Sequence, residues 1–291
     1  MTIGAWLAAA EDALTRSGDA DARADGLLML CQATGLTRSM ARLSRGEALD
    51  DATQAQLEIW LKRRLSGEPL QYILGVAPFM GYDFLCDARA LIPRFDTETL
   101  CDGALTAMRG QPVPSVLDLC CGTGAIGLSV ALKKPDARVT LADLSEDALA
   151  LARENAERLG AKNVCFRAGD LFGAVPGARY DYILCNPPYL TQADMADLQA
   201  EVRFEPAMAL CGGRDGLDFY RRIAGSAPDH LLPGGAIFLE VGMGQAGAVG
   251  ELLLKAGLDH IGALRDLNGV ERVVTARRPS QETMMGDHSC S

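Results

Sequence analysis

The sequence predicts an α/β fold: a mostly parallel, doubly wound sheet preceded by a small helical domain. From Ser115 onward, short apolar runs alternate with helical stretches, which is the pattern of βα units. Before residue 79, apolar residues recur at three- and four-residue spacing, as they do on amphipathic helices. The length of 291 residues, with 48% hydrophobic content, suits one large domain and a smaller one.

The N-terminal part is expected to be helical. Helical periodicity runs from Ala20 to Leu30 and from Asp51 to Leu65, and Gly67-Glu68-Pro69 ends the second stretch. Beyond it, residues from Phe79 to Leu91 are typical of a hairpin or an extended linker, with Gly81 at the turn.

The C-terminal part is expected to contain seven strands. Five follow one another at 116–119, 139–143, 164–166, 182–185 and 236–241, and two short ones flank the Asn268-Gly269 turn. Helices are expected at 124–133, 145–159 and 246–256, with Ser145 as an N-cap. The predicted segments are therefore a helical domain at 1–78, a hairpin or linker at 79–98, a sheet domain at 99–279 and a disordered tail at 280–291.

Composition excludes several classes of function. The net charge of −10 and pI of about 4.9 oppose non-specific binding to nucleic acid. The nine cysteines form no CxxC pair and only three histidines are present, so no metal site is expected. With neither a signal peptide nor a membrane-spanning run, we expect a cytoplasmic protein with reduced cysteines.

The most informative motif is Asn186-Pro187-Pro188-Tyr189, which directly follows the buried strand 182–185. The carboxyl end of a parallel strand is the usual ligand edge of such a sheet. Asn186 offers an amide oxygen, the two prolines leave carbonyls free to face a ligand, and Tyr189 offers an aromatic face. The motif therefore indicates a site that grips a planar NH2 group.

A glycine-rich loop follows the strand 116–119. It reads Asp118-Leu-Cys120-Cys121-Gly122-Thr123-Gly124-Ala-Ile-Gly127, and Asp143 ends the next strand. Small residues let a ligand approach a helix N-terminus, and a carboxylate at the second strand end binds ribose hydroxyls. Taken alone, these features fit NAD and S-adenosylmethionine equally well.

Two carboxylates favour S-adenosylmethionine. Asp118 precedes the glycines, where it could face the ligand's ammonium group but would repel a pyrophosphate. Asp170 and Leu171 follow the third strand, where adenine would be contacted. Either Asp143 or Asp170 alone is equally well explained as a solvated residue at a strand end.

With both motifs, the chain resembles class I S-adenosylmethionine-dependent methyltransferases that act on nitrogen. Further segments resemble the bacterial release-factor glutamine methyltransferases (the HemK/PrmC family). They are Gly67-Glu-Pro-Leu-Gln-Tyr-Ile-Leu-Gly75, Leu91-Ile-Pro-Arg-Phe-Asp-Thr-Glu98, Phe204-Glu-Pro206 and Gly212-Gly-Arg-Asp-Gly-Leu217. The resemblance covers roughly residues 20 to 278.

The resemblance implies a Rossmann-like methyltransferase domain, with a seven-stranded sheet, joined to an N-terminal helical domain. It implies methylation of N5 of the glutamine in the Gly-Gly-Gln motif of class I peptide chain release factors. We expect residues 1–78 to dock the protein substrate, because the catalytic pocket alone is too small to choose among surface glutamines. A monomer is expected, with no stable binding to nucleic acid and none to membrane. The implied cofactor residues are Asp118, Cys120, Cys121, Gly122, Thr123, Gly124, Asp143, Asp170, Leu171 and Asn186. The implied substrate residues are Asn186, Pro187, Pro188 and Tyr189, and catalysis is assigned to Asn186, Pro187 and Tyr189. The family usually has glycine where Cys120 stands.

Other polar residues have simpler interpretations. Arg94 either binds the cofactor or partner or forms an ion pair with Asp96 or Glu98, and Glu240 is expected to be solvated or hydrogen-bonded. Arg63 and Arg64 are expected on an exposed helix face.

Two alternatives stay open at this point. An adenine-N6 methyltransferase would use the same motif to hold a flipped base, although the acidic composition opposes it. A dehydrogenase or nucleotide-binding module would use the glycine-rich loop but leaves Asn186 to Tyr189 without a role.

Overall fold

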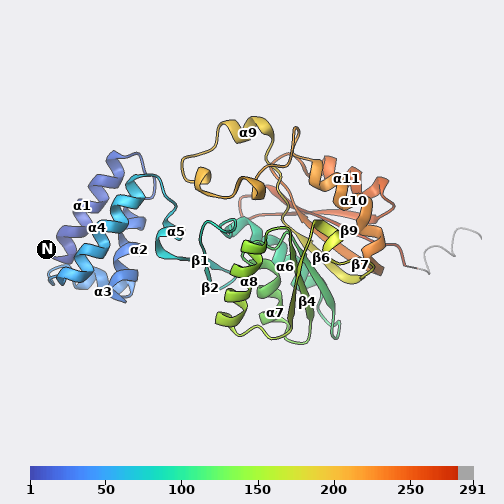
Figure 1. The fold of residues 1–291 in the computed structure, drawn as a ribbon, viewed down its shortest axis with the longest axis horizontal. Helices are drawn as coiled ribbons and strands as arrows, with labels where there is room; N and C mark the ends of the chain where they lie inside the picture. Colours follow the sequence, from blue (N-terminus) through green and yellow to red (C-terminus); the bar gives the residue numbers. More distant parts are fainter. Residues whose placement is uncertain (281–291) are drawn as a thin grey trace, which may run out of the picture. The chain divides into compact units, whose positions relative to one another are not determined.

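The computed structural model describes residues 1–280 of the chain (Figure 1). Of the predicted disordered tail at 280–291, residues 281–291 lie outside the described part. Two compact units are present, one formed by Met1–Val76 with Gln199–Phe204 and the other by Ala77–Leu198 with the chain from Glu205 onward. No helix within residues 1–280 has the length and apolar character needed to cross a membrane.

The first unit is helical. It contains α1 (Ile3–Arg16), α2 (Ala22–Thr34), α3 (Arg38–Leu43), α4 (Asp51–Leu65) and α5 (Leu70–Leu74). The predicted helix from Asp51 to Leu65 has the bounds of α4, because the Asp50 side chain accepts a hydrogen bond from the Thr53 N–H group and caps its start. Its core includes Trp6, Leu14 and Met29, all at most 3% exposed.

The expectation that Arg64 lies on an exposed face was wrong. Its side chain is buried and its guanidinium pairs with Asp19 at 2.9 Å, Asp25 at 2.6 Å and Glu201 at 2.6 Å. Burying a cation is tolerated only when carboxylates surround it. This cluster holds the segment Gln199–Phe204 to the helical unit.

The hairpin lies slightly earlier than predicted. Its strands are β1 (Val76–Phe79) and β2 (Tyr82–Leu85), so the first one begins before residue 79. Gly75, in the left-handed conformation, ends α5 and allows the chain to turn directly into β1. Ala77 and Phe79 then bury alternate side chains.

The second unit is built on a seven-stranded sheet, as predicted, with strand order β5-β4-β3-β6-β7-β9-β8. The strands are β3 (Ser115–Leu119), β4 (Arg138–Asp143), β5 (Val164–Ala168), β6 (Tyr180–Cys185), β7 (Leu231–Glu240), β8 (Asp259–Arg265) and β9 (Glu271–Arg277). The first five are parallel, whereas β9 pairs antiparallel with both β7 and β8.

Helices cover both faces of this sheet (Figure 1). One face carries α6 (Glu98–Ala107), α7 (Ala125–Lys133) and α8 (Glu146–Leu159), and the other carries α10 (Asp218–His230) and α11 (Ala246–Lys255). Along β6, Tyr182 and Leu184 pack on the first face, whereas Ile183 and Cys185 pack on the second. Short helices complete the second unit: α9 (Gln192–Ala196), η1 (Phe95–Thr97), η2 (Leu171–Ala174) and η4 (Ala207–Ala209). A further short helix, η3 (Val202–Phe204), belongs to the first unit.

The chain reverses its direction across the sheet between β3 and β6. From β3 it proceeds outward through β4 and β5, and it then returns to β6 and continues to β7. Leu119 is aligned with Ala142 on one side and with Cys185 on the other, so these strands end at the same level. A doubly wound sheet binds its ligands at such a switch point.

Candidate functional site

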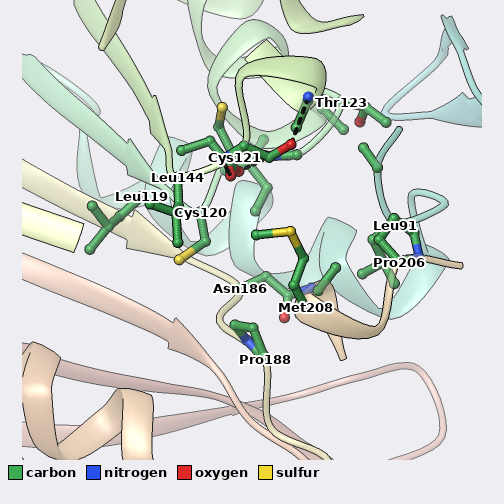
Figure 2. A pocket seen from close by; sticks show the side chains of 18 of the residues that line it. Leu91, Leu119, Cys120, Cys121, Thr123, Leu144, Asn186, Pro188, Pro206 and Met208 are labelled. Carbon is green, nitrogen blue, oxygen red and sulfur yellow. Dashed lines mark hydrogen bonds between the residues drawn. The ribbon is translucent and has the colours of Figure 1, made fainter. Parts of the chain in front are cut away.

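A cavity of about 280 Å³ lies at this switch point, lined entirely by residues of the second unit. Figure 2 shows Cys120, Cys121 and Leu144 along one side of it, with Leu91 and Pro206 across from them and Asn186 and Met208 between. Of the predicted site residues, it brings together Cys120, Cys121, Gly122, Thr123, Asp143, Asp170, Leu171, Asn186 and Pro188. Asp118, Gly124, Pro187 and Tyr189 are not among its lining residues.

The glycine-rich loop turns tightly between β3 and α7. Gly124 has φ of +80°, and a Cβ there would meet Leu128, Leu141 and Ala152 at 3.0 to 3.2 Å. A Cβ at Gly127 would come within 2.9 Å of Asp118, so glycine allows α7 to pack closely on the strand. Cys120 has φ of +59°, a conformation in which a Cβ is unfavourable.

Asp143 ends β4 and borders the cavity. Its carboxylate accepts hydrogen bonds from the Gly122 N–H group at 2.8 Å and from the Ser145 N–H group at 2.9 Å. Burial raises the pKa of this carboxyl, and the two backbone donors lower it. Asp143 therefore holds the loop in place, and the residue also lines the cavity.

Asp118 is fully buried beneath the loop. Its carboxylate accepts a hydrogen bond from the Gly127 N–H group at 2.8 Å, which caps the first turn of α7 from the neighbouring strand. Among the described residues, its other oxygen has no hydrogen-bond partner, and burial raises its pKa to about 8. The position of Asp118 therefore gives no support to a contact with the ligand's ammonium group.

The residues after β5 reach the cavity from another side. Leu171 is 8% exposed and has φ of +48°, and Asp170 forms an exposed ion pair with Arg222 at 2.6 Å. The apolar side chain of Leu171 could pack against a flat ring of a ligand. The charge of Asp170 is instead paired with the exposed guanidinium of Arg222.

The Asn-Pro-Pro-Tyr segment follows β6. Asn186 is partly buried, and its Nδ2 lies 3.4 Å from Thr97 Oγ1. Tyr189 packs against the apolar core on the α10 and α11 face, and burial raises its pKa to about 12. The amide of Asn186 is thus at the cavity, while the Tyr189 ring lies behind it.

Another wall of the cavity is formed by Leu91, Ile92, Pro93, Arg94, Thr97, Pro206 and Met208. Of these residues, the sequence had suggested a site role only for Arg94, as one of two alternatives. Of the two alternatives for Arg94, an ion pair is present, but its partner is Glu205 instead of Asp96 or Glu98. The Glu205 carboxylate also accepts a hydrogen bond from the Ile92 N–H group at 2.9 Å. The only sequence signal for this wall was that both segments carry the family resemblance.

A doubly wound sheet with this strand order, a glycine-rich loop and a strand-end carboxylate defines the class I S-adenosylmethionine-dependent methyltransferases. The family models that match are the methyltransferase small domain, over residues 103–209, and the PrmC N-terminal domain, over residues 5–75. A methyltransferase from Pyrococcus furiosus has a similar fold, with a TM-score of 0.52 and 18% identity over 79% of this chain and 100% of that one.

Two curated relatives are both called release factor glutamine methyltransferase. The one from Bordetella pertussis is 46% identical and covers 82% of this chain and 88% of its own length. The one from Geobacter sulfurreducens is 41% identical and covers 91% of this chain and 92% of its own length. The chain belongs to the release factor glutamine methyltransferase family.

Proposed function

We propose that the chain transfers a methyl group from S-adenosylmethionine to the side-chain amide nitrogen, N5, of the Gly-Gly-Gln glutamine in class I peptide chain release factors. The observation that carries this proposal is the position of Asn186 and Pro188, which border the same cavity as the glycine-rich loop. Family membership supports the substrate class.

The residues of the cavity suit S-adenosylmethionine. Asp143 offers a carboxylate for the ribose hydroxyls, Cys120 to Thr123 offer a loop for the methionine part, and Leu171 offers an apolar wall for adenine. When bound, S-adenosylmethionine supplies a methyl group on a positively charged sulfur. In this proposal, Asp118 stabilises the loop from below.

Asn186 and Pro187 position the glutamine amide. An amide nitrogen is a poor nucleophile because its lone pair is delocalised into the carbonyl. The Asn186 side-chain oxygen and the Pro187 carbonyl accept hydrogen bonds from its two N–H groups, and Pro188 contributes to the cavity wall. Positioning of this kind supplies up to about 7–11 kcal/mol of the barrier.

The acceptors also strengthen as positive charge develops on the nitrogen. Tyr189 was predicted to pack directly on the amide plane; it is partly buried against the apolar core and is not among the residues that line the cavity. We therefore assign it to supporting the conformation of the motif. The nitrogen proton leaves to water after methyl transfer, so no general base is required.

The helical unit is proposed to dock the protein substrate, because a cavity of about 280 Å³ is too small to select one glutamine among many. We expect the protein to act as a monomer in the cytoplasm, where release factors work. With a net charge of −10, we expect no stable binding to nucleic acid.

The test is transfer of label from S-adenosylmethionine to purified release factor, with its Gly-Gly-Gln glutamine intact or changed to alanine. Duplex and single-stranded DNA serve as parallel substrates. Label on the intact factor alone is expected. Label on DNA, or equal label on the alanine variant, would contradict the proposal.

A further inference from the structure

A buried carboxylate stands directly behind the Asn-Pro-Pro-Tyr motif. Cys185 and Leu239 are aligned partners in the parallel strands β6 and β7. The next residue of each chain segment, Asn186 after Cys185 and Glu240 after Leu239, therefore lies at the same edge of the sheet. Glu240 is 2% exposed and does not line the cavity. Of its two predicted surroundings, the solvated one was therefore wrong.

The polar groups nearest the Glu240 carboxylate connect it to Asn186. The Thr97 hydroxyl and the Asn186 amide both lower its pKa, as nearby hydrogen-bond donors do. Asn186 Nδ2 also lies 3.4 Å from Thr97 Oγ1. Thr97 stands at the N-cap of α6, yet its hydroxyl makes no capping bond, which leaves it free for these partners.

An asparagine amide has nearly the same shape in its two orientations, and only its hydrogen-bond partners decide which end points where. An ionised carboxylate accepts hydrogen bonds but donates none. Glu240 therefore draws the NH2 end of Asn186 toward itself, and the Oδ1 end is directed away from it. A protonated Glu240 would donate a hydrogen bond and remove this preference.

We propose that Glu240 is a positioning residue, which orients the Asn186 amide so that its oxygen faces the substrate nitrogen. The inference rests on the proposed function, because it assigns Asn186 the task of accepting a hydrogen bond from the glutamine amide. One carboxylate oxygen, Oε2, has no hydrogen-bond partner among the described residues. A buried acceptor without a donor lowers stability, so folding alone does not explain a glutamate here.

The electrostatic surroundings make this orientation sensitive to pH. Burial raises the pKa of Glu240 to about 7, the nearby Asp96 raises it as well, and Thr97, Arg272 and Asn186 lower it. The titratable and charged groups that face Glu240 are Asp96, Cys101, Tyr189, Tyr220 and Arg272. Its ionised fraction therefore changes near neutral pH, where it would change the orientation of Asn186.

The kinetic test compares the wild type with Glu240→Gln. We expect kcat to fall about 10- to 100-fold, because a misplaced acceptor loses the positioning advantage, with unchanged KM for S-adenosylmethionine. The kcat of the wild type should fall as the pH decreases through about 7, and the variant should lack this inflection. Thr97→Ser should retain more activity than Thr97→Val, since only serine keeps the hydroxyl.

The folding control is Asp181→Asn, which makes the same kind of change at the opposite end of β6, where Asp181 accepts from the Ser115 N–H group at 2.8 Å. Its kcat and pH profile should match the wild type. A folded Glu240→Gln enzyme with the kcat and the inflection of the wild type would overturn the inference.

A second readout needs no methyl acceptor. In protein labelled with 15N at asparagine, the side-chain NH2 signals of Asn186 should move with pH in the wild type and stay fixed in Glu240→Gln. Signals that ignore pH in the wild type would overturn the inference even if methyl transfer is normal. If release factor is not labelled by the wild type, the proposed function fails, and the NMR titration alone decides the role of Glu240.

Discussion

At the scale of single residues, Cys120 carries a side chain at a backbone position that favours glycine. It has φ of +59° and lies on the cavity, in the glycine-rich loop. A left-handed conformation costs a residue with a Cβ about 1–2 kcal/mol. We expect Cys120→Gly to be more stable than Cys120→Ala by about 1 kcal/mol, since only glycine removes this strain.

Urea unfolding of the two variants measures this difference. Both variants lack the thiol, and only the alanine variant keeps a Cβ. The difference between their unfolding free energies therefore measures the backbone strain and not the loss of the thiol. Equal stability of the two variants, or a more stable alanine variant, would contradict the role assigned to the backbone.

Sequence reasoning at this scale succeeded where a residue follows a predictable strand. Cys120 and Asn186 come directly after a parallel strand and Asp143 ends one, and such strand ends meet at one edge of a sheet. It failed for Arg64 and Glu240, because the burial of a charged side chain depends on partners far away in the sequence. Arg64 and Glu201, for example, are 137 positions apart.

At the scale of elements, the cavity wall depends on Glu205. Its carboxylate holds the Ile92 N–H group and the Arg94 guanidinium, and both residues line the cavity. Glu205→Ala should cost about 1–3 kcal/mol of stability, because it leaves a buried N–H group without its acceptor. It should also weaken binding of S-adenosylhomocysteine, because the wall formed by Leu91 to Arg94 loses its support.

Chemical unfolding and calorimetric titration measure these two effects. The matched control is Glu251→Gln, which removes an exposed ion pair with Lys255 and should change stability by less than about 0.5 kcal/mol. Unchanged ligand affinity in a folded Glu205→Ala protein would show that the wall does not depend on this carboxylate.

Elements with clear periodicity were predicted well, as α4 demonstrates. The helices α6 and α10 were not predicted, because Gly103 and Pro228 interrupt their sequences. Tertiary packing explains the glycine: a Cβ at Gly103 would lie 2.4 Å from Leu264 of β8. The bounds of the hairpin were also misjudged, because the short β1 follows a five-residue helix without a polar turn.

At the scale of the whole molecule, several buried carboxyls make stability depend on pH in an unusual direction. Burial raises the pKa of Asp25 to about 6, of Glu240 to about 7 and of Asp118 to about 8. The ordinary values are 3.8 for aspartate and 4.5 for glutamate. The folded state therefore binds these protons more tightly than the unfolded state does.

The stabilisation from these protons is complete below the ordinary pKa values and is lost as pH rises through about 6 to 8. We expect the free energy of unfolding of the ligand-free protein to decrease between about pH 5 and pH 8.5. Urea titrations across this range measure it, and Glu240→Gln should flatten the slope. If the free energy of unfolding rises over the same pH range, the conclusion that burial raises the pKa of these carboxyls would be contradicted.

The large-scale organisation followed from patterns that extend over many residues. Alternating strands and helices predicted the seven-stranded sheet and its two covered faces. That Gln199–Phe204 belongs to the helical unit could not be predicted, because it depends on the ion pair of Arg64 with Glu201.

The most direct test of the account is single-turnover methyl transfer to release factor by the wild type and by Asn186→Ala, with binding of S-adenosylhomocysteine measured in parallel. Asn186 lies at the switch point beside the cofactor loop, and we assign it the hydrogen bond that holds the glutamine nitrogen. We expect a loss of at least about 100-fold in the rate of transfer, because a transition-state acceptor is removed, while the fold survives and the ligand still binds. A near-normal rate in Asn186→Ala would contradict it.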